Sequence, residues 1–165
     1  MNLQEAAAQA NELATAGDEK AIADLRRTWA DEVEGAARDP DYRVRAVAYR
    51  AIGQFRYRQK LELLQRGLED ESPAVRGSAL VSLELLSRDH PAAVNQARRL
   101  LTDMATGDGN EAVRRLAIVC LRNGSGQRET ILLLEGLADD DDQSRELRDA
   151  AKKVAAALTK KSRAK

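Results

Sequence analysis

One stretch of the chain decides the fold: Glu69-Asp70-Glu71-Ser72-Pro73-Ala74-Val75-Arg76. Its pattern is an aspartate, an arginine six residues later, a branched apolar residue directly before the arginine and an alanine three residues after it. The pattern occurs four times, as Asp39-Val44-Arg45-Ala48, Asp70-Val75-Arg76-Ala79, Asp108-Val113-Arg114-Ala117 and Asp142-Leu147-Arg148-Ala151. The four arginines lie 31, 38 and 34 residues apart, which is the period of a repeat built from two helices.

This repetition predicts an all-α fold of the solenoid type. Apolar residues follow each copy at the three-to-four spacing of one buried helical face, as in Val75, Ala79, Leu83 and Leu86. We expect nine helices, namely a leading helix and about four helical hairpins, which stack into a right-handed α-α superhelix. Residues 1–159 would form this single domain. The last helix would end near Leu158, and residues 160–165 would form a basic, disordered tail.

The composition agrees with packed helices. Charged residues make up 33% of the chain and aromatic residues only 3%, which argues against a sheet protein. The formal net charge is zero, so the chain as a whole shows no preference for nucleic acid or for an anionic membrane. Polar residues interrupt Met1 to Gly17 too often for a signal peptide, and no stretch approaches the length of a membrane span. We therefore expect a soluble, cytoplasmic protein without membrane contact.

Each residue of the repeated pattern has a mechanical role. The aspartate lies in the turn between two helices, where its carboxylate can accept free N–H groups of the second helix. The arginine can reach the aspartate of its own or of the adjoining hairpin, so stacked hairpins would form a ladder of charge-assisted hydrogen bonds. The apolar residue points into the hairpin, and the alanine lets a neighbouring helix pass closely. The predicted ladder consists of Asp39, Arg45, Asp70, Arg76, Asp108, Arg114, Asp142 and Arg148.

With these motifs the chain resembles the HEAT-repeat family, and within it the short bacterial form found in bilin-lyase-like and other small scaffold proteins. The resemblance rests on residues 39–45, 69–76 and 109–114 and covers about residues 19 to 158, with a degenerate last copy. It implies a non-catalytic scaffold or adaptor that binds another protein through a concave face lined by the second helix of each hairpin. A few such proteins assist chromophore attachment, and some related helical-repeat proteins process damaged DNA.

Helical geometry then selects candidate contact residues. At 100° per residue, the face opposite the core of the helix that begins near Asp41 carries an aromatic and basic group. The corresponding positions further along are first apolar and then basic again, at Lys152 and Lys153. A groove for a partner helix or peptide is one interpretation of the apolar strip. The alternative is that the residues at the flank of the strip, Tyr49, Leu80 and Ile118, are buried against the adjacent unit. The predicted partner-binding residues are Tyr42, Tyr49, Arg50, Tyr57, Val81 and Val119.

Two other functions remain open. Residues 42–58 combine all three tyrosines with several arginines, and Asp41 and Glu62 enclose a stretch that holds six cations and no acid. Tyrosine and arginine together suit base stacking and phosphate contact, which makes a nucleic-acid binder the second candidate. Zero net charge and the acid-rich last third count against it. The third candidate is an accessory subunit of an enzyme, such as a bilin-lyase-type complex.

Little in the sequence points to catalysis. The chain has one histidine, His90, and one cysteine, Cys120, so neither a histidine cluster nor an intrachain disulfide can form. The acidic run from Asp139 to Asp142 lacks the ordered spacing and glycine of a calcium loop. We expect no enzyme activity, no catalytic, cofactor or metal site, and a partner that is another protein. The sequence names neither that partner nor an oligomeric state.

Overall fold

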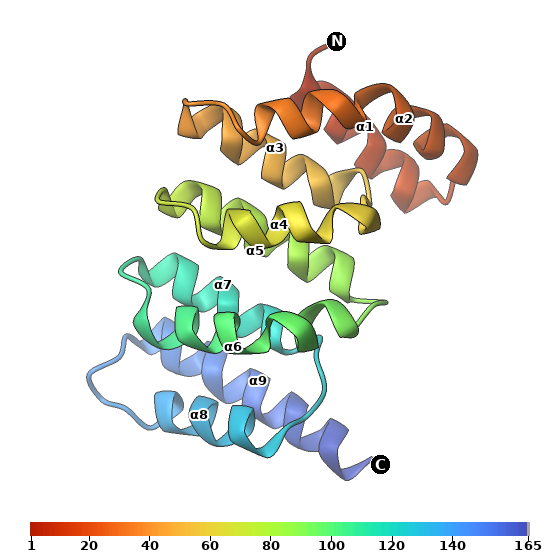
Figure 1. Cartoon of the computed structure of the whole chain (residues 1–165). Helices are drawn as coiled ribbons and strands as arrows, with labels where there is room; N and C mark the ends of the chain where they lie inside the picture. Colours follow the sequence, from red (N-terminus) through yellow and green to blue (C-terminus); the bar gives the residue numbers. More distant parts are fainter. Residues whose placement is uncertain (165) are drawn as a thin grey trace. The chain divides into compact units, whose positions relative to one another are not determined.

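The computed structural model describes residues 1–164 and is all-helical over this range, with nine α-helices and one short 3-10 helix (Figure 1). The chain forms two compact units, one from Met1 to Leu86 and one from Ser87 onward. The elements are α1 (Leu3–Ala16), α2 (Glu19–Ala36), α3 (Tyr42–Gln54), η1 (Arg58–Lys60), α4 (Leu61–Leu68), α5 (Pro73–Ser87), α6 (Ala92–Gly107), α7 (Glu111–Leu121), α8 (Arg128–Ala138) and α9 (Arg145–Arg163).

The helices follow the predicted order of a leading helix and four hairpins. In the first unit α1 packs on both α2 and α3, and α2 packs on α3. In the second unit α6 packs on α7, α8 packs on α9, and α7 also packs on α9. Figure 1 shows α8 and α9 side by side as one such hairpin. The prediction of an all-α, HEAT-like helical repeat is therefore confirmed, whereas the right-handed superhelix and a single domain of residues 1–159 stay predictions.

Local signals in the sequence set the helix starts. Asp18 accepts a hydrogen bond from the Ala21 N–H, as an N-cap of α2 should. The caps of α3 and α7 are Asp41 and Asn110, which lie two residues after the repeated aspartates. Asp39 and Asp108 accept bonds from the N–H groups of these two caps, so they fix the turn before the helix and do not reach the helix itself.

The core of each unit is built from the predicted apolar stripes. In α5, Val75, Ala79, Leu83 and Leu86 are all buried, and Cys120 of α7 is a buried free thiol. Val44 is different, because its side chain is exposed although its counterparts Val75, Val113 and Leu147 are buried. The prediction that the apolar residue before the arginine points inward is therefore wrong for the first copy.

The last helix is longer than predicted. Helix α9 ends at Arg163, so residues 160–163 are helical, and the prediction of a disordered tail is wrong for them. The physical reason is that the Lys161 ammonium donates to the carbonyl oxygens of Arg122 and Gly124, which ties the end of α9 to the end of α7. Gly126 is also held against α9, since a Cβ there would lie 2.3 Å from the Leu158 carbonyl oxygen. Residue 165 lies outside the described residues.

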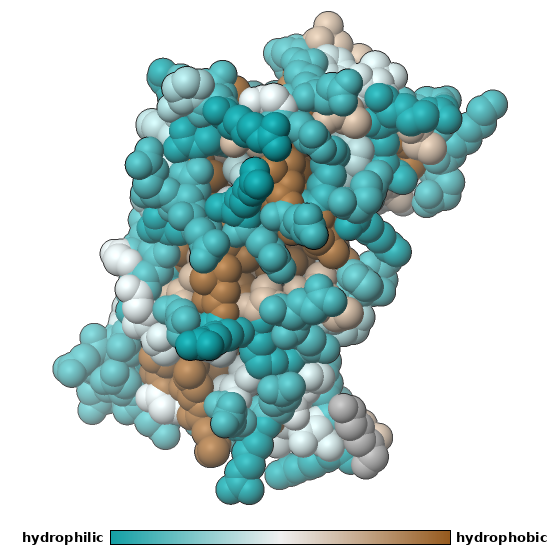
Figure 2. Space-filling view, in the orientation of Figure 1, coloured by the Kyte–Doolittle hydropathy of each residue, from teal (hydrophilic) through white to brown (hydrophobic). Residues whose placement is uncertain are grey.

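The surface reflects the charged composition. Figure 2 shows hydrophilic side chains over most of the face on view, with apolar groups exposed between them. Within residues 1–164, no helix combines the length and the apolar composition that crossing a bilayer requires.

Candidate functional site

The contact between the first two repeated motifs is a bidentate ion pair. The Arg45 Nε and Nη2 atoms donate to the two carboxylate oxygens of Asp70, each at 3.0 Å, and the same guanidinium donates through Nη1 to the carbonyl oxygens of Asp39 and Pro40. Burial raises the pKa of Asp70, but the hydrogen bonds from Arg45 and from the Ser72 N–H lower it more, so that this pKa lies below its ordinary value. Arg45 thereby joins the turn before α3 to the turn before α5.

The other ladder residues occupy similar turns with different partners. Arg76 donates to the carbonyl oxygens of Asp70 and Glu71, as Arg45 does in its own turn. Arg114 donates to the Ala105 carbonyl oxygen at the end of α6. Arg148 lies 3.6 Å from the exposed carboxylate of Asp141. The arginines therefore hold the turns at the hairpin bends.

The fourth aspartate of the ladder is not the one that the spacing selects. Asp140, and not Asp142, accepts a backbone N–H bond from two residues ahead, as Asp39, Asp70 and Asp108 do. Hydrogen bonds from the Gln143 side chain and the Asp142 N–H lower the pKa of Asp140, and the charges of Arg114 and Arg148 add to this effect. The assignment of Asp142 to the ladder is corrected to Asp140, because the last turn is two residues longer than the others.

Two of the six predicted partner-binding residues lie in the core. Tyr49 is 3% exposed and Tyr57 1% exposed. The Tyr49 ring fills the space beside Gly67 of α4, where a Cβ would lie 2.6 Å from a ring carbon. Arg56 has a left-handed backbone (φ 58°), which ends the helical path and turns Tyr57 inward, where its hydroxyl donates to the Arg26 carbonyl oxygen. The prediction that these two tyrosines form a contact surface is wrong.

Most cations of residues 42–58 and Lys60 have partners within the fold. Arg45 is held by Asp70, Arg43 donates to Asp41 and Lys60 donates to Glu34. Arg56 donates to Asn11 and to carbonyl oxygens at the end of α3. With two of its three tyrosines buried and these charges paired, the region lacks the stacking platform and free basic track of a nucleic-acid site. This counts against the second candidate function.

The remaining predicted contact residues reach the surface to different degrees. Tyr42 is exposed, whereas Arg50 and Val81 are half-buried. Val119 is 38% exposed, about as much as Val44 at 37%. Val119, Val81 and Arg50 share one register, five residues after the arginine of each motif. One residue earlier, at Tyr49, Leu80 and Ile118, every side chain is buried.

Val119 lies in a groove between α7 and α9. This α7/α9 groove has a volume of about 630 Å³, and its apolar floor includes Leu116, Val119, Ala150 and Val154. Charged side chains border it, with Arg115 and Arg122 on α7 and Glu146, Asp149 and Lys153 on α9. The Arg115 Nε atom is buried and has no hydrogen-bond partner within residues 1–164. The groove is therefore apolar along its middle and charged at its rim.

Side-chain size explains why the second unit has this groove. In the first unit, the Gly53 N–H of α3 donates to the Ser82 hydroxyl of α5 at 2.9 Å, and a Cβ on Gly53 would lie 2.7 Å from the Ser82 Cα. The two helices therefore meet backbone to backbone at this point. By register from the motif arginine, Arg122 and Val154 take the places of Gly53 and Ser82 in the second unit. Side chains of that size exclude so close an approach, and both line the groove.

Helical spacing in the sequence predicted Val119 and Lys153 on this face but not the other residues of the groove. Leu116 and Ala150 stand two residues after the motif arginines, and Arg115 and Asp149 stand one residue after them. A signal was present in the sequence. The second helices of two successive hairpins lie next to each other, so the positions one, two and five residues after the motif arginine in both helices line one groove. Considering each helix alone did not show this.

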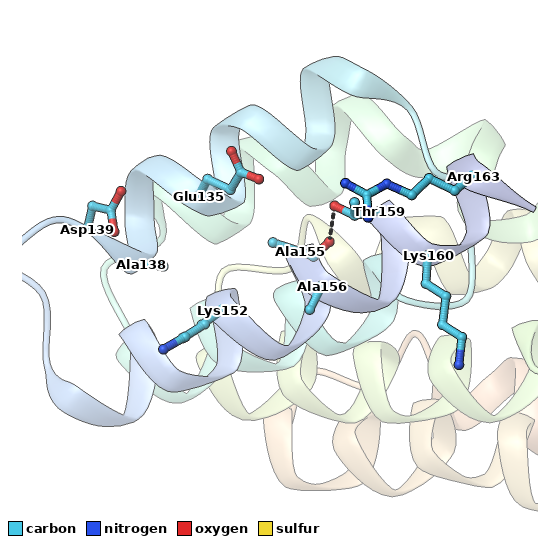
Figure 3. A pocket seen from close by; sticks show the side chains of 9 residues that line it. All are labelled: Glu135, Ala138, Asp139, Lys152, Ala155, Ala156, Thr159, Lys160 and Arg163. Carbon is cyan, nitrogen blue, oxygen red and sulfur yellow. Dashed lines mark hydrogen bonds between the residues drawn. The ribbon is translucent and has the colours of Figure 1, made fainter.

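A second hollow lies between α8 and α9, with a volume of about 580 Å³. Figure 3 shows Glu135 of α8 and Asp139, which directly follows α8, across the hollow from a stretch of α9 whose small residues include Ala155 and Ala156. The Thr159 hydroxyl donates to the Ala155 carbonyl oxygen at 2.8 Å, and Lys160 points away from α8 (Figure 3). This hollow owes its shape to small side chains and carries no large apolar anchor.

Within residues 1–164, no group of three or more histidine, cysteine, aspartate or glutamate side chains has an arrangement that could hold a metal ion. The candidate site is the α7/α9 groove, which has an apolar floor and a charged rim. Repeated helical hairpins held at their turns by arginine define the class as an α-helical repeat protein.

Comparison with known proteins agrees with this class. A family model described as HEAT repeats matches residues 33–105, which include the motifs of Arg45 and Arg76. Over these residues the chain is similar to HEAT repeats. A comparison with curated proteins gives no match. HEAT repeats are generally protein-interaction scaffolds and are typically non-catalytic.

Proposed function

We propose that the chain is a non-catalytic adaptor that binds a partner protein through the α7/α9 groove. The observation that carries this proposal is that Val119 is exposed on the apolar floor between α7 and α9. Burying apolar area in a preformed groove is the main source of affinity when an amphipathic segment docks on a helical surface. The similarity to HEAT repeats supports an interaction role, and the apolar floor of the groove supports this location for it.

The proposal keeps Val119 from the predicted contact set and extends it to Leu116 and Ala150, which are half-buried and line the groove. Arg50 and Val81 of the first unit, which are in the same register as Val119, stay candidate contacts. The exposed Tyr42 also stays a candidate. Tyr49 and Tyr57 are left out because both are in the core.

The test compares two substitutions that each replace an exposed apolar side chain by a carboxylate, one inside the groove and one outside it. Val119→Asp places a carboxylate on the groove floor, and Leu132→Asp does so on α8 at a side chain that is 54% exposed and outside the groove. Proteins that co-purify with the unmodified chain should be lost with Val119→Asp and retained with Leu132→Asp. Circular dichroism and the melting temperature of both variants establish that each is folded.

If both variants retain the same co-purifying proteins, the α7/α9 groove is not the binding site. If both lose them, the effect is not specific to the groove, and the proposal is equally wrong. A loss confined to Val119→Asp supports it.

A further inference from the structure

The α7/α9 groove carries different charges at its two ends. Glu146 lies in the first turn of α9 and Asp149 follows one turn later, at the beginning of the groove. At the other end, Lys153 is in the same register as Val119, and Arg122 lies beyond it. The distance along α9 from residue 146 to residue 153 is about 11 Å, or two helical turns. The apolar floor is therefore two turns long, with two acids and Arg115 at one end and bases alone at the other.

Neighbouring charges modify this polarity without removing it. Arg115 is at the acidic end, in the same register as Asp149. The Arg145 Nε atom lies 3.9 Å from a carboxylate oxygen of Asp149, one turn further along α9. Glu146 is exposed at this end. At the basic end the Lys161 ammonium donates to the Arg122 carbonyl oxygen. Burial, together with the charge of Arg122, lowers the pKa of Lys161. Arg115 and Arg145 offset the two acids at their end, whereas the other end has Arg122 and Lys153 and no acid among the residues that line the groove, so the basic end carries the larger net charge.

We propose that the occupant of this groove is a two-turn amphipathic helix of a partner protein, with acidic residues at the end that lies over Arg122 and Lys153 and a basic residue at the end that lies over Glu146. This inference rests on the proposed function and adds the chemistry of the partner. Apolar side chains of the helix at positions i, i+3 or i+4, and i+7 would fill the floor around Val119. The charges at the two ends fix the orientation of the helix, because the reversed orientation would place like charges together.

A peptide selection tests this chemistry directly, because it does not require the partner to be identified. A displayed library of helical peptides, with leucines fixed at i, i+4 and i+7 and charged residues varied elsewhere, is selected on the immobilised full chain. Peptides that also bind the Val119→Asp variant are removed. The enriched peptides should carry acids in one half and bases in the other. Their affinity should fall at least tenfold for the double variant Arg122→Gln/Lys153→Gln.

The matched control neutralises two other lysines of α9, Lys152→Gln/Lys160→Gln, which line the α8/α9 hollow instead. Both double variants change exposed side chains, and their melting temperatures show whether they fold. The control should leave the affinity within about twofold of the unmodified chain, since screened charges outside the groove contribute little.

The outcomes separate the inference from the proposed function. Peptides that depend on Val119 but carry mixed or uniform charges overturn the charge polarity and leave the adaptor function intact. An equal loss of affinity with the two double variants also overturns the polarity. A selection that yields no peptide dependent on Val119 overturns both the occupant and the groove as a binding site.

Discussion

Arg45 and Asp70, which are 25 residues apart in the sequence, form a two-bond ion pair that joins the turns of successive hairpins. Their side chains are 12% and 13% exposed, so the pair is largely removed from water. A guanidinium is planar and presents two parallel N–H bonds to a carboxylate, which an ammonium group cannot do. The pair therefore fixes both the distance and the angle between neighbouring turns.

Replacing Arg45 by lysine should destabilise the protein, because the charge remains but the paired bonds to Asp70 and the bonds to Asp39 and Pro40 do not. Arg43→Lys is the matched control, since Arg43 pairs with Asp41 at an exposed position. We expect thermal denaturation to show a fall of several degrees in Tm for Arg45→Lys and of less than about one degree for Arg43→Lys. Equal falls in Tm for the two variants would show that the bonds of Arg45 stabilise the protein no more than the exposed pair of Arg43 does.

Asp70 should make stability depend on acidic pH. Its pKa is lower in the folded protein than the ordinary value of about 3.9, so the folded state favours the carboxylate. The stabilisation is complete above the unfolded pKa and is lost as the pH falls through the folded pKa. The Tm difference between the unmodified chain and Asp70→Asn should therefore be larger at neutral pH than near pH 3. A difference that is constant with pH would contradict the lowered pKa.

Gly53→Ala should separate α3 from α5. The new methyl group would lie 2.7 Å from the Cα of Ser82, and backbone cannot move away as a flexible side chain can. We expect a loss of about 1–3 kcal/mol in urea denaturation, as for other overpacked sites. Gly136→Ala in α8 is the control, because a Cβ there meets nothing within 4 Å. That change should stabilise the helix by up to about 1 kcal/mol.

Tyr57 should resist ionisation. Burial raises its pKa to about 12, and the charge of Arg26 only partly opposes this. The folded state favours the protonated phenol, so the stabilisation is present below the unfolded pKa of about 10 and is lost as the pH rises toward 12. Tyrosinate absorbance should show a late component that Tyr57→Phe removes. If the variant loses only a component that titrates near pH 10, Tyr57 is not buried as described.

The end of α9 can be tested with two adjacent lysines. Lys161 donates to the carbonyl oxygens of Arg122 and Gly124, whereas Lys160 is exposed. Lys161→Met should cost about 1 kcal/mol in urea denaturation, the usual net value of lost hydrogen bonds, and Lys160→Met should be neutral. Identical stabilities for the two variants would mean that Lys161 does not hold the last turns of the helix.

Local patterns in the sequence were sufficient for the helices. Asp18 and the repeated motifs mark where helices start, and the stripe from Val75 to Leu86 marks the buried face of α5, because capping and helical periodicity depend on residues within a few positions of each other. The same reasoning could not place Tyr57. Its position depends on the left-handed backbone of Arg56, and nothing in the spacing of the tyrosines indicates that turn.

Residue spacing alone selects the wrong acid for the fourth turn of the ladder. Arg148 of the fourth motif lies 3.6 Å from Asp141, but its turn is longer than the others, and Asp140 replaces Asp142 as the acid that accepts the turn bond. A run of four aspartates offers several acids at nearly the same distance from Arg148. Which of them fixes the turn depends on the path of the loop, which the pattern does not encode.

Local signals act in the same way in every copy of the motif, so they are sufficient to predict a chain of helical hairpins with arginine at each bend. The side chains that face outward could not be predicted from these signals: Tyr49 is buried beside Gly67, and Val119 is exposed beside Val154. Exposure depends on the size of the residue on the neighbouring helix. Small residues such as Gly53 and Ser82 bring two helices into contact, and larger ones such as Arg122 and Val154 leave a groove.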